Sequence, residues 1–136
     1  MKRGKQTLAE PCPCGSGQAY AHCCGPWHAG APAPDAETLM RSRYAAYALK
    51  LEPYLLATWH PDTRPARLDL AGDTARWIGL EVRRATQDSE DRATVEFVAR
   101  CKIAGRAHRL HERSRFVKIA GRWFYRDGET PQRDSV

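Results

Sequence analysis

The chain has 136 residues, and its 22 lysines and arginines against 16 acidic residues give a formal net charge of +6. This length allows one domain with a small appendage, and 42% hydrophobic with 28% charged residues is typical of a globular protein and not of a disordered chain. No run approaches the ~18 apolar residues of a membrane span, and no apolar segment follows the basic residues of the N-terminus. We therefore expect neither a membrane span nor a secretory signal, and we expect a cytoplasmic location.

Four of the five cysteines lie within thirteen residues, as a Cys-x-Cys pair, eight residues, and then a Cys-Cys pair. In a cytoplasmic protein such clustered thiols indicate a metal site and not disulfides. The segment has too few apolar residues to fold by packing alone, and four thiolates on one Zn²⁺ would supply the missing free energy and leave no open coordination position. The predicted ligands of this structural Zn²⁺ are Cys12, Cys14, Cys23 and Cys24, with His22 or His28 as open alternatives for one cysteine.

With its inner Gly-Ser-Gly and Tyr20, this pattern resembles the SEC-C motif, a small zinc-binding module. The segments 39–47 (LMRSRYAAY), 58–61 (TWHP) and 122–125 (RWFY) are similar to the bacterial YchJ-like family. The resemblance implies a SEC-C module over residues 1–30, followed over residues 31–136 by a domain of the nuclear transport factor 2-like (NTF2-like) fold. SEC-C modules typically carry lysines after Gly-Ser-Gly, where this chain has Gln18 and Ala19, so we expect no partner contact through such a basic strip.

Residues 25–34 (GPWHAGAPAP) are rich in Gly, Ala and Pro and predict a linker without a regular element. Trp27, inside this segment, either folds back on the metal module or stays exposed as an interaction hot spot. Asp35 is the predicted N-cap of a helix over residues 36–49. The apolar stripe of this helix, which includes Met40, Tyr44 and Tyr47, is expected to pack on a sheet.

A second short helix is expected from about Pro53, because proline is favoured at the first helical position. It is predicted to carry Leu55 and Trp59 and to end at His60-Pro61. Residues 61–73 lack periodicity and are expected to form a loop, with room for one extra helical turn.

From Arg76 onward the apolar residues recur with a period of two, which is typical of strands. The predicted strands cover residues 76–86, 92–102, 107–118 and 121–126. Consecutive strands with short connections form an antiparallel meander, and helices followed by strands indicate the α+β class. The NTF2-like fold implied by the resemblance, with helices on a curved antiparallel sheet, agrees with this pattern.

Alternation along the third predicted strand places Glu112 on the inner face of the sheet, where an ionised carboxylate needs a partner. We expect Arg43 of the first long helix to form that ion pair. The pair either fixes how the helix docks on the sheet or forms an acid–base or ligand-anchoring group in a small cavity. On the outer face the strand carries Arg109, His111, Arg113 and Arg115. The candidate pocket residues are Arg43, Tyr44, Tyr47, His108 and Glu112.

Three functional hypotheses follow from these residues. The leading one is a zinc-binding interaction or adaptor protein whose SEC-C module recruits a protein partner. The alternative is a small enzyme or small-ligand-binding protein that uses the cavity around Glu112. An enzyme is not favoured, because the chain contains no G-x-G-x-x-G, G-x-S-x-G or H-E-x-x-H motif. Nucleic-acid binding through the arginines of residues 100–126 ranks last, because the aromatic residues that would stack on bases are assigned to the core.

Overall fold

The computed structural model describes residues 7–131, and a four-stranded antiparallel sheet forms its largest layer. The strand order is β1-β2-β3-β4, so each strand pairs with its neighbour in the sequence and the sheet is the predicted meander. The strands are β1 (Arg76–Ser89), β2 (Arg92–Ile103), β3 (Arg106–Ile119) and β4 (Arg122–Glu129). The first three strands are longer than predicted, because their ladder hydrogen bonds continue to the turns. Strand β4 begins at Arg122, one residue later than predicted, and extends beyond the predicted end to Glu129.

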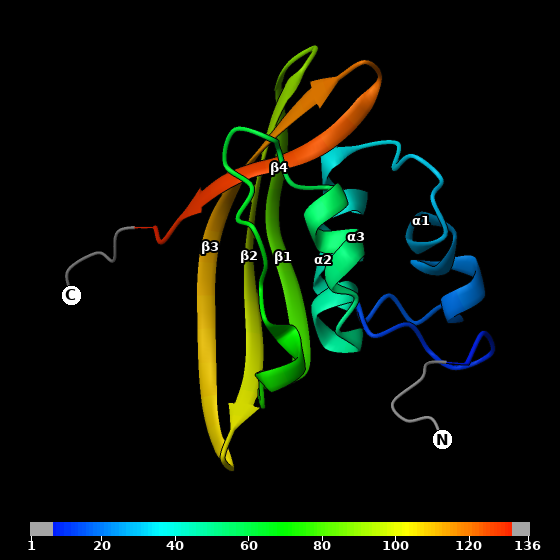
Figure 1. Ribbon diagram of the computed structural model, residues 1–136, viewed down its shortest axis with the longest axis vertical. Coiled ribbons are helices and arrows are strands. Elements are labelled where there is room, and N and C mark those ends of the chain that lie inside the picture. Colours follow the sequence, from blue (N-terminus) through cyan, green and yellow to red (C-terminus); the bar gives the residue numbers. More distant parts are fainter. Residues whose placement is uncertain (1–6, 132–136) are drawn as a thin grey trace.

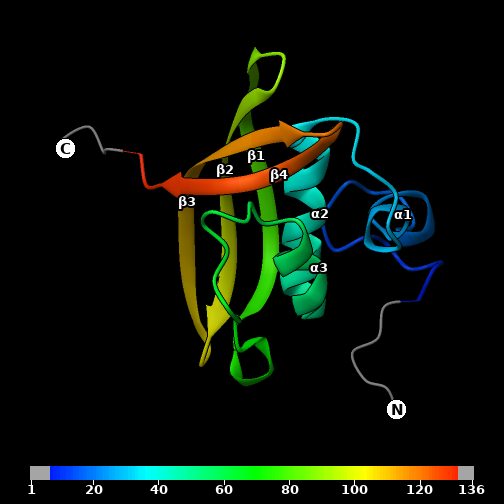
Figure 2. The ribbon, with the colours of Figure 1, turned by 45° about the horizontal axis from the view of Figure 1, so that its top comes forward.

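Two of the hairpins close through an alanine and a glycine that both take left-handed backbone conformations. The φ angles are 53° and 79° at Ala104 and Gly105, and 52° and 83° at Ala120 and Gly121. Two consecutive residues with positive φ match the right-handed twist of the flanking strands. The tight connections therefore favour a twisted sheet. In Figures 1 and 2, β4 and the end of β3 with which it pairs cross β1 and β2 at a steep angle.

Helix α2 (Ala36–Leu49) packs on one face of this sheet, as predicted, and its bounds agree with the sequence. Its N-cap is Asp35, whose side chain accepts a hydrogen bond of 2.8 Å from the Thr38 N–H. The helix ends at Leu49, and the C-cap residue Lys50 adopts a left-handed conformation with a φ of 60°. Together the helices and the sheet confirm the α+β class and the NTF2-like arrangement.

Helix α3 (Glu52–Ala57) lies beside α2 and is shorter than predicted. Trp59 falls outside it and forms an isolated parallel bridge with Tyr125 of β4. Two backbone hydrogen bonds complete this attachment, from His60 N–H to the Tyr125 carbonyl (2.7 Å) and from Tyr125 N–H to the Thr58 carbonyl (2.9 Å). The loop that follows contains the expected extra turn, a 3-10 helix η2 (Leu70–Gly72).

The N-terminal segment contains two short helical turns, η1 (Tyr20–His22) and α1 (Gly25–His28). The prediction of a linker without regular structure was therefore wrong for the first four residues of that segment. Pro26 lies in the first turn of α1, where its missing N–H costs no hydrogen bond. Trp27 packs against the hydrophobic core and is partly buried, which confirms the interpretation that it folds back.

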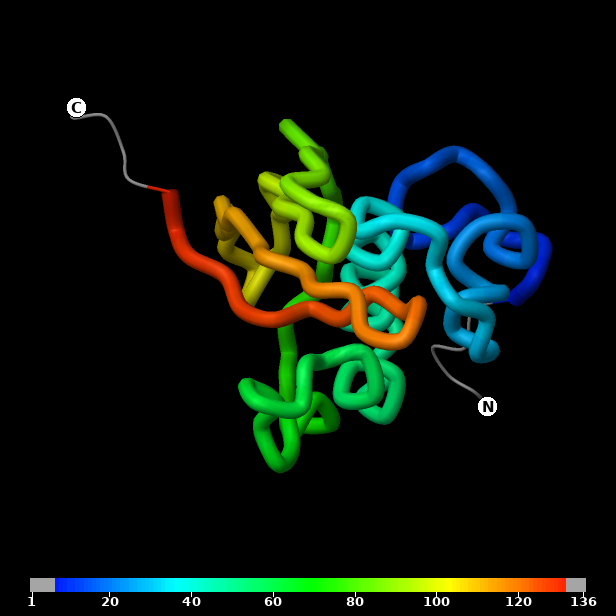
Figure 3. The backbone as a smooth tube through the Cα atoms, turned by 90° about the horizontal axis from the view of Figure 1, so that it is seen from above, coloured from blue at the N-terminus to red at the C-terminus, as the bar shows by residue number. Residues whose placement is uncertain are grey.

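Helix α2 separates the sheet from the N-terminal segment, as Figures 1 and 3 show. Cys12, Cys14 and Cys24 belong to the same buried cluster as Leu39 of α2 and Phe97 of β2. The cysteine segment and the helix–sheet layers therefore share one hydrophobic core. No helix within residues 7–131 is long and apolar enough to cross a membrane.

Candidate metal centre and ligand cavity

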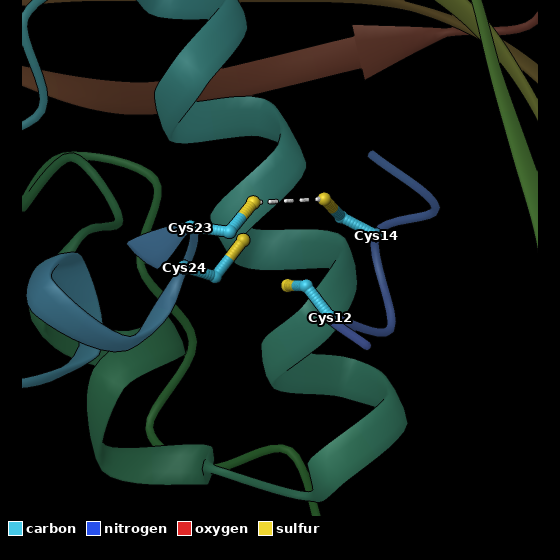
Figure 4. Close-up of side chains that lie close together, drawn as sticks. All are labelled: Cys12, Cys14, Cys23 and Cys24. Atoms are coloured by element: carbon cyan, nitrogen blue, oxygen red, sulfur yellow. Dashed lines mark hydrogen bonds between the residues drawn. The ribbon is translucent and has the colours of Figure 1, made fainter. Parts of the chain in front are cut away.

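The four clustered cysteines converge on one point beside α2 (Figure 4). Their Sγ atoms all lie within 4.8 Å of one another, and those of Cys14 and Cys23 are 3.5 Å apart. Cys12 and Cys14 come from one loop, while Cys23 and Cys24 follow η1 and lead into α1. Gly15 and Gly17, with φ angles of 82° and 89°, turn the chain between the two pairs.

This geometry fits a tetrahedral metal site. Four thiolates at about 2.3 Å from one ion place their sulfur atoms about 3.8 Å apart, and the observed cluster is compact enough for such an arrangement. Cys12, Cys14 and Cys24 are buried, whereas Cys23 is half-buried and lies 3.0 Å from the Ser16 hydroxyl. The arrangement is compatible with metal binding by all four cysteines.

The thiols also interact strongly with one another. Hydrogen bonds from the Cys12 and Cys24 thiols hold the pKa of Cys14 far below its ordinary value. The hydrogen bond to Cys14, joined by burial, raises the pKa of Cys12 to about 11, and the bonds to Cys12 and Cys14 raise the pKa of Cys24. Several thiolates at this spacing repel one another, so a cation is needed before all of them can ionise.

Both ring nitrogens of His28 are engaged, so this histidine is not available as a ligand. Its Nε2 lies 2.8 Å from the Ser42 carbonyl of α2, and its Nδ1 lies 2.6 Å from the Tyr20 hydroxyl. A carbonyl only accepts, so Nε2 carries the hydrogen and Nδ1 accepts from Tyr20. His22 is exposed and outside the cysteine group. His28 therefore links the cysteine segment to α2.

The second candidate site is a cavity of about 270 Å³ between α2 and the inner face of the sheet. Of the predicted pocket residues, Arg43, Tyr44, Tyr47 and Glu112 line it, whereas His108 does not and is exposed. His108 shares the face of β3 that carries Glu112, but it lies near the start of the strand, next to the turn from β2. The remaining wall consists of Met40, Trp77, Phe97, Ala99, Leu110, Ser114, Phe116 and Tyr125.

The Glu112 carboxylate is held by hydroxyl groups of its own strand and of β4. Its Oε2 accepts hydrogen bonds from the Ser114 hydroxyl (2.7 Å) and the Tyr125 hydroxyl (3.2 Å). Burial, with the nearby Glu112 charge, raises the pKa of Tyr125, so this hydroxyl stays a donor. Gly128 of β4 makes room for the carboxylate, because a Cβ at this position would collide with it.

The expected ion pair between Arg43 and Glu112 was wrong. Within the described residues Arg43 contacts no carboxylate, and its Nη1 donates to the Leu55 carbonyl (2.8 Å) and the Thr58 hydroxyl (2.6 Å). The guanidinium lies 5.0 Å from the centre of the Trp59 ring and 4.5 Å from that of Tyr125. Burial lowers the pKa of Arg43, and the Glu112 charge opposes this shift without contact.

Sequence reasoning did not place Ser114, Tyr125 and Gly128 around the Glu112 carboxylate. Ser114 lies two residues after Glu112 and therefore shares its face, which was a usable signal. Tyr125 and Gly128 lie on β4, and their proximity to Glu112 depends on a register shift between Arg115 and Phe116 that the sequence does not reveal.

The outer face of the sheet carries ion pairs, as its predicted alternation allows. His111 and Arg113 contact Glu96, and Arg113 also contacts Glu129. Arg115 donates to Asp127 over 2.7 Å. These basic residues of the 100–126 stretch are already paired, which leaves less positive charge for phosphates than the composition suggests. The fifth cysteine, Cys101, is buried and lies outside the cluster.

Comparison with known proteins finds two family models that match this chain. The model described as the YchJ middle NTF2-like domain matches residues 35–128, and that of the SEC-C motif matches residues 9–26. A UPF0225 protein of Methylibium petroleiphilum is 62% identical over 121 residues and covers 88% of both chains. A UPF0225 protein of Bordetella pertussis is 57% identical over 132 residues, which are 95% of this chain and 98% of the relative.

Two solved structures are also similar. The solution structure of a SEC-C motif containing protein from Rhodopseudomonas palustris has a TM-score of 0.80 and 38% identity, and the match covers 90% of this chain and all (100%) of that one. The crystal structure of a SEC-C motif containing protein from Psychrobacter arcticus has a TM-score of 0.78 and 30% identity, over 94% of this chain and 86% of that chain.

Proposed function

The chain belongs to the YchJ-like UPF0225 family, and from this premise we propose that it is a zinc-stabilised protein that binds a small molecule in the cavity around Glu112. The observation that carries the proposal is a carboxylate in the wall of an otherwise largely aromatic cavity. Pockets of this composition, apolar with a few polar groups that converge, are typical ligand sites.

The metal part of the proposal assigns Zn²⁺ to Cys12, Cys14, Cys23 and Cys24. When bound, the ion cross-links the two cysteine pairs and so stabilises the fold. Four thiolate ligands are typical of closed structural zinc sites. Such a cluster also suits a reducing compartment, so we propose a cytoplasmic location. We also propose that residues 1–30 form the zinc module and that residues 31–136 form the second domain.

Elemental analysis of untagged protein tests the metal. We expect one zinc per chain, and four thiols that become reactive when a chelator removes it. Cys12→Ser should lose the metal, whereas Cys101→Ser, a change at a buried cysteine outside the cluster, should keep it. Metal-free protein with four reactive thiols, in a preparation never exposed to chelator, would contradict the assignment.

Blocking the mouth of the cavity tests the ligand site. Leu110 lines the cavity and is 41% exposed, while Ile119, on the same strand, is also 41% exposed but lies away from it. We expect saturable NMR shifts with small aromatic fragments, lost in Leu110→Trp and retained in the matched control Ile119→Trp. Equal binding by both variants would refute a site in this cavity.

A second candidate function is recruitment of a protein partner through the SEC-C module. One observation favours it: a groove of about 260 Å³ runs beside the cluster, with Trp27 in its wall and the exposed His22 at its rim. Capture experiments would compare intact protein with His22→Glu, a change outside the four-cysteine set. A partner retained by intact protein and released by this variant would support the role, and identical proteins captured by both would argue against it.

A further inference from the structure

We propose that the ligand of the cavity is a neutral, mainly aromatic small molecule that donates one hydrogen bond to Glu112. This inference rests on the proposed ligand-binding function and adds the chemical class of the ligand. It follows from three properties of the cavity: its walls, its charge balance and its uncommitted hydrogen-bonding groups.

The walls favour a flat apolar ligand. Rings of Tyr44, Trp77, Phe97 and Phe116 surround the space. Aromatic side chains attract other rings through stacked and edge-to-face contacts. A volume of about 270 Å³ is near the lower end for ligand sites, which suits a molecule of one or two fused rings.

The charges favour a neutral ligand. The wall holds one cation and one carboxylate, Arg43 and Glu112, which influence each other electrostatically without direct contact. Their charges already balance, so a charged ligand would bring an unpaired charge into an apolar space at a considerable desolvation cost. An anion would in addition be repelled by the Glu112 carboxylate in the same wall.

The hydrogen-bond inventory specifies a donor on the ligand. Glu112 Oε2 already accepts from Ser114 and Tyr125, while Oε1 has no hydrogen-bond partner within residues 7–131. Because Oε1 has no partner there and is not fully buried, a ligand in the cavity can reach it. A carboxylate oxygen only accepts, so the group that completes this site is an O–H or N–H of the ligand.

The test compares three probes of similar shape by calorimetry and NMR titration: 2-naphthol, naphthalene and 2-naphthylmethylammonium. We expect 2-naphthol to bind at least about tenfold more tightly than naphthalene, because a hydrogen bond to a charged acceptor contributes a factor of roughly 10 to 100. The ammonium probe should bind more weakly than 2-naphthol. These comparisons use the unaltered protein and so do not depend on a variant that folds.

Glu112→Gln adds a matched variant. The Ser114 and Tyr125 hydroxyls should keep the amide oxygen, which turns the amide nitrogen, a donor, toward the ligand. We expect the advantage of 2-naphthol over naphthalene to disappear, while naphthalene binds as before. The Ser114→Ala variant leaves the carboxylate in place and should retain the advantage.

The outcomes separate the inference from the function on which it rests. If naphthalene and 2-naphthol bind equally, or the ammonium binds best, the inference is overturned while the cavity remains a ligand site. If none of the probes binds, both the inference and the proposed site are refuted. A tenfold preference for 2-naphthol that Glu112→Gln removes, with binding blocked in Leu110→Trp, supports both.

Discussion

Tyr20→Phe should destabilise the protein by breaking the hydrogen-bonded link from the cysteine segment to α2. The Tyr20 hydroxyl donates to His28 Nδ1 over 2.6 Å, and His28 Nε2 donates to the Ser42 carbonyl over 2.8 Å. The substitution removes one donor and leaves a half-buried ring nitrogen without a partner. A typical hydrogen bond contributes about 1 kcal/mol, and an orphaned acceptor costs somewhat more, so we expect a loss of about 1.5 kcal/mol.

The assay is thermal unfolding of the zinc-loaded protein. For a chain of this size, a destabilisation of 1.5 kcal/mol corresponds to a fall in Tm of roughly 5 °C. A double-mutant cycle with His28→Phe provides the control, because Tyr20→Phe should cost little once the ring nitrogen is gone. Additive losses would refute the link, and so would nitrogen NMR spectra that place the His28 hydrogen on Nδ1.

Three further predictions concern the cavity and the loop after α3. Gly128→Ala should lower the free energy of unfolding by about 1–3 kcal/mol, measured in urea titrations, because the added Cβ would displace the Glu112 carboxylate from its hydrogen-bond donors. In a Glu112→Ala background the same substitution should cost almost nothing, and an equal loss there would contradict this reason. Arg43→Lys should lower Tm by roughly 6 °C in thermal scans, since an ammonium cannot replace the planar guanidinium between two rings; an unchanged Tm would contradict this role. Glu52 accepts hydrogen bonds from two backbone N–H groups, which lower its pKa below the ordinary 4.5, so its stabilisation is present above pH 4.5 and is lost as the pH falls through the lowered value. The Tm difference between wild type and Glu52→Gln should therefore close on acidification, and a difference that is constant with pH would argue against this assignment.

The long elements were predictable because local signals specify them. Asp35 and the following apolar stripe define where α2 begins, and the period of two identifies four strands without tertiary information. The cysteine spacing likewise identifies the cluster, because a short glycine-rich turn brings the two cysteine pairs close together. These features depend on short stretches of chain, which is why sequence reasoning reached them.

The missed features depend on how elements dock. Helix α1 forms in a Gly- and Pro-containing segment that is anchored by tertiary contacts, notably that of His28 with α2. Alternation placed His108 on the same face as Glu112, but it does not tell how far along β3 the cavity extends. The Arg43 side chain was predicted to point inward, and it does. Its partners, however, follow from the position of α3, which supplies the Leu55 carbonyl.

The attachment of residues 58–60 to β4 also bears on the order in which the chain assembles. Most pairings in this sheet join neighbouring strands, and such local contacts form early and fast. The bridge between Trp59 and Tyr125 instead joins residues far apart in the sequence. It brings together the two aromatic rings that contact the Arg43 guanidinium. During synthesis from the N-terminus, α2 and the first hairpin are complete before β4 exists, so the guanidinium stays hydrated until β4 has been made. We therefore expect the enclosure of Arg43 to form late in folding, so substitutions at Trp59 or Tyr125 should act mainly on the rate of unfolding, which stopped-flow kinetics would measure.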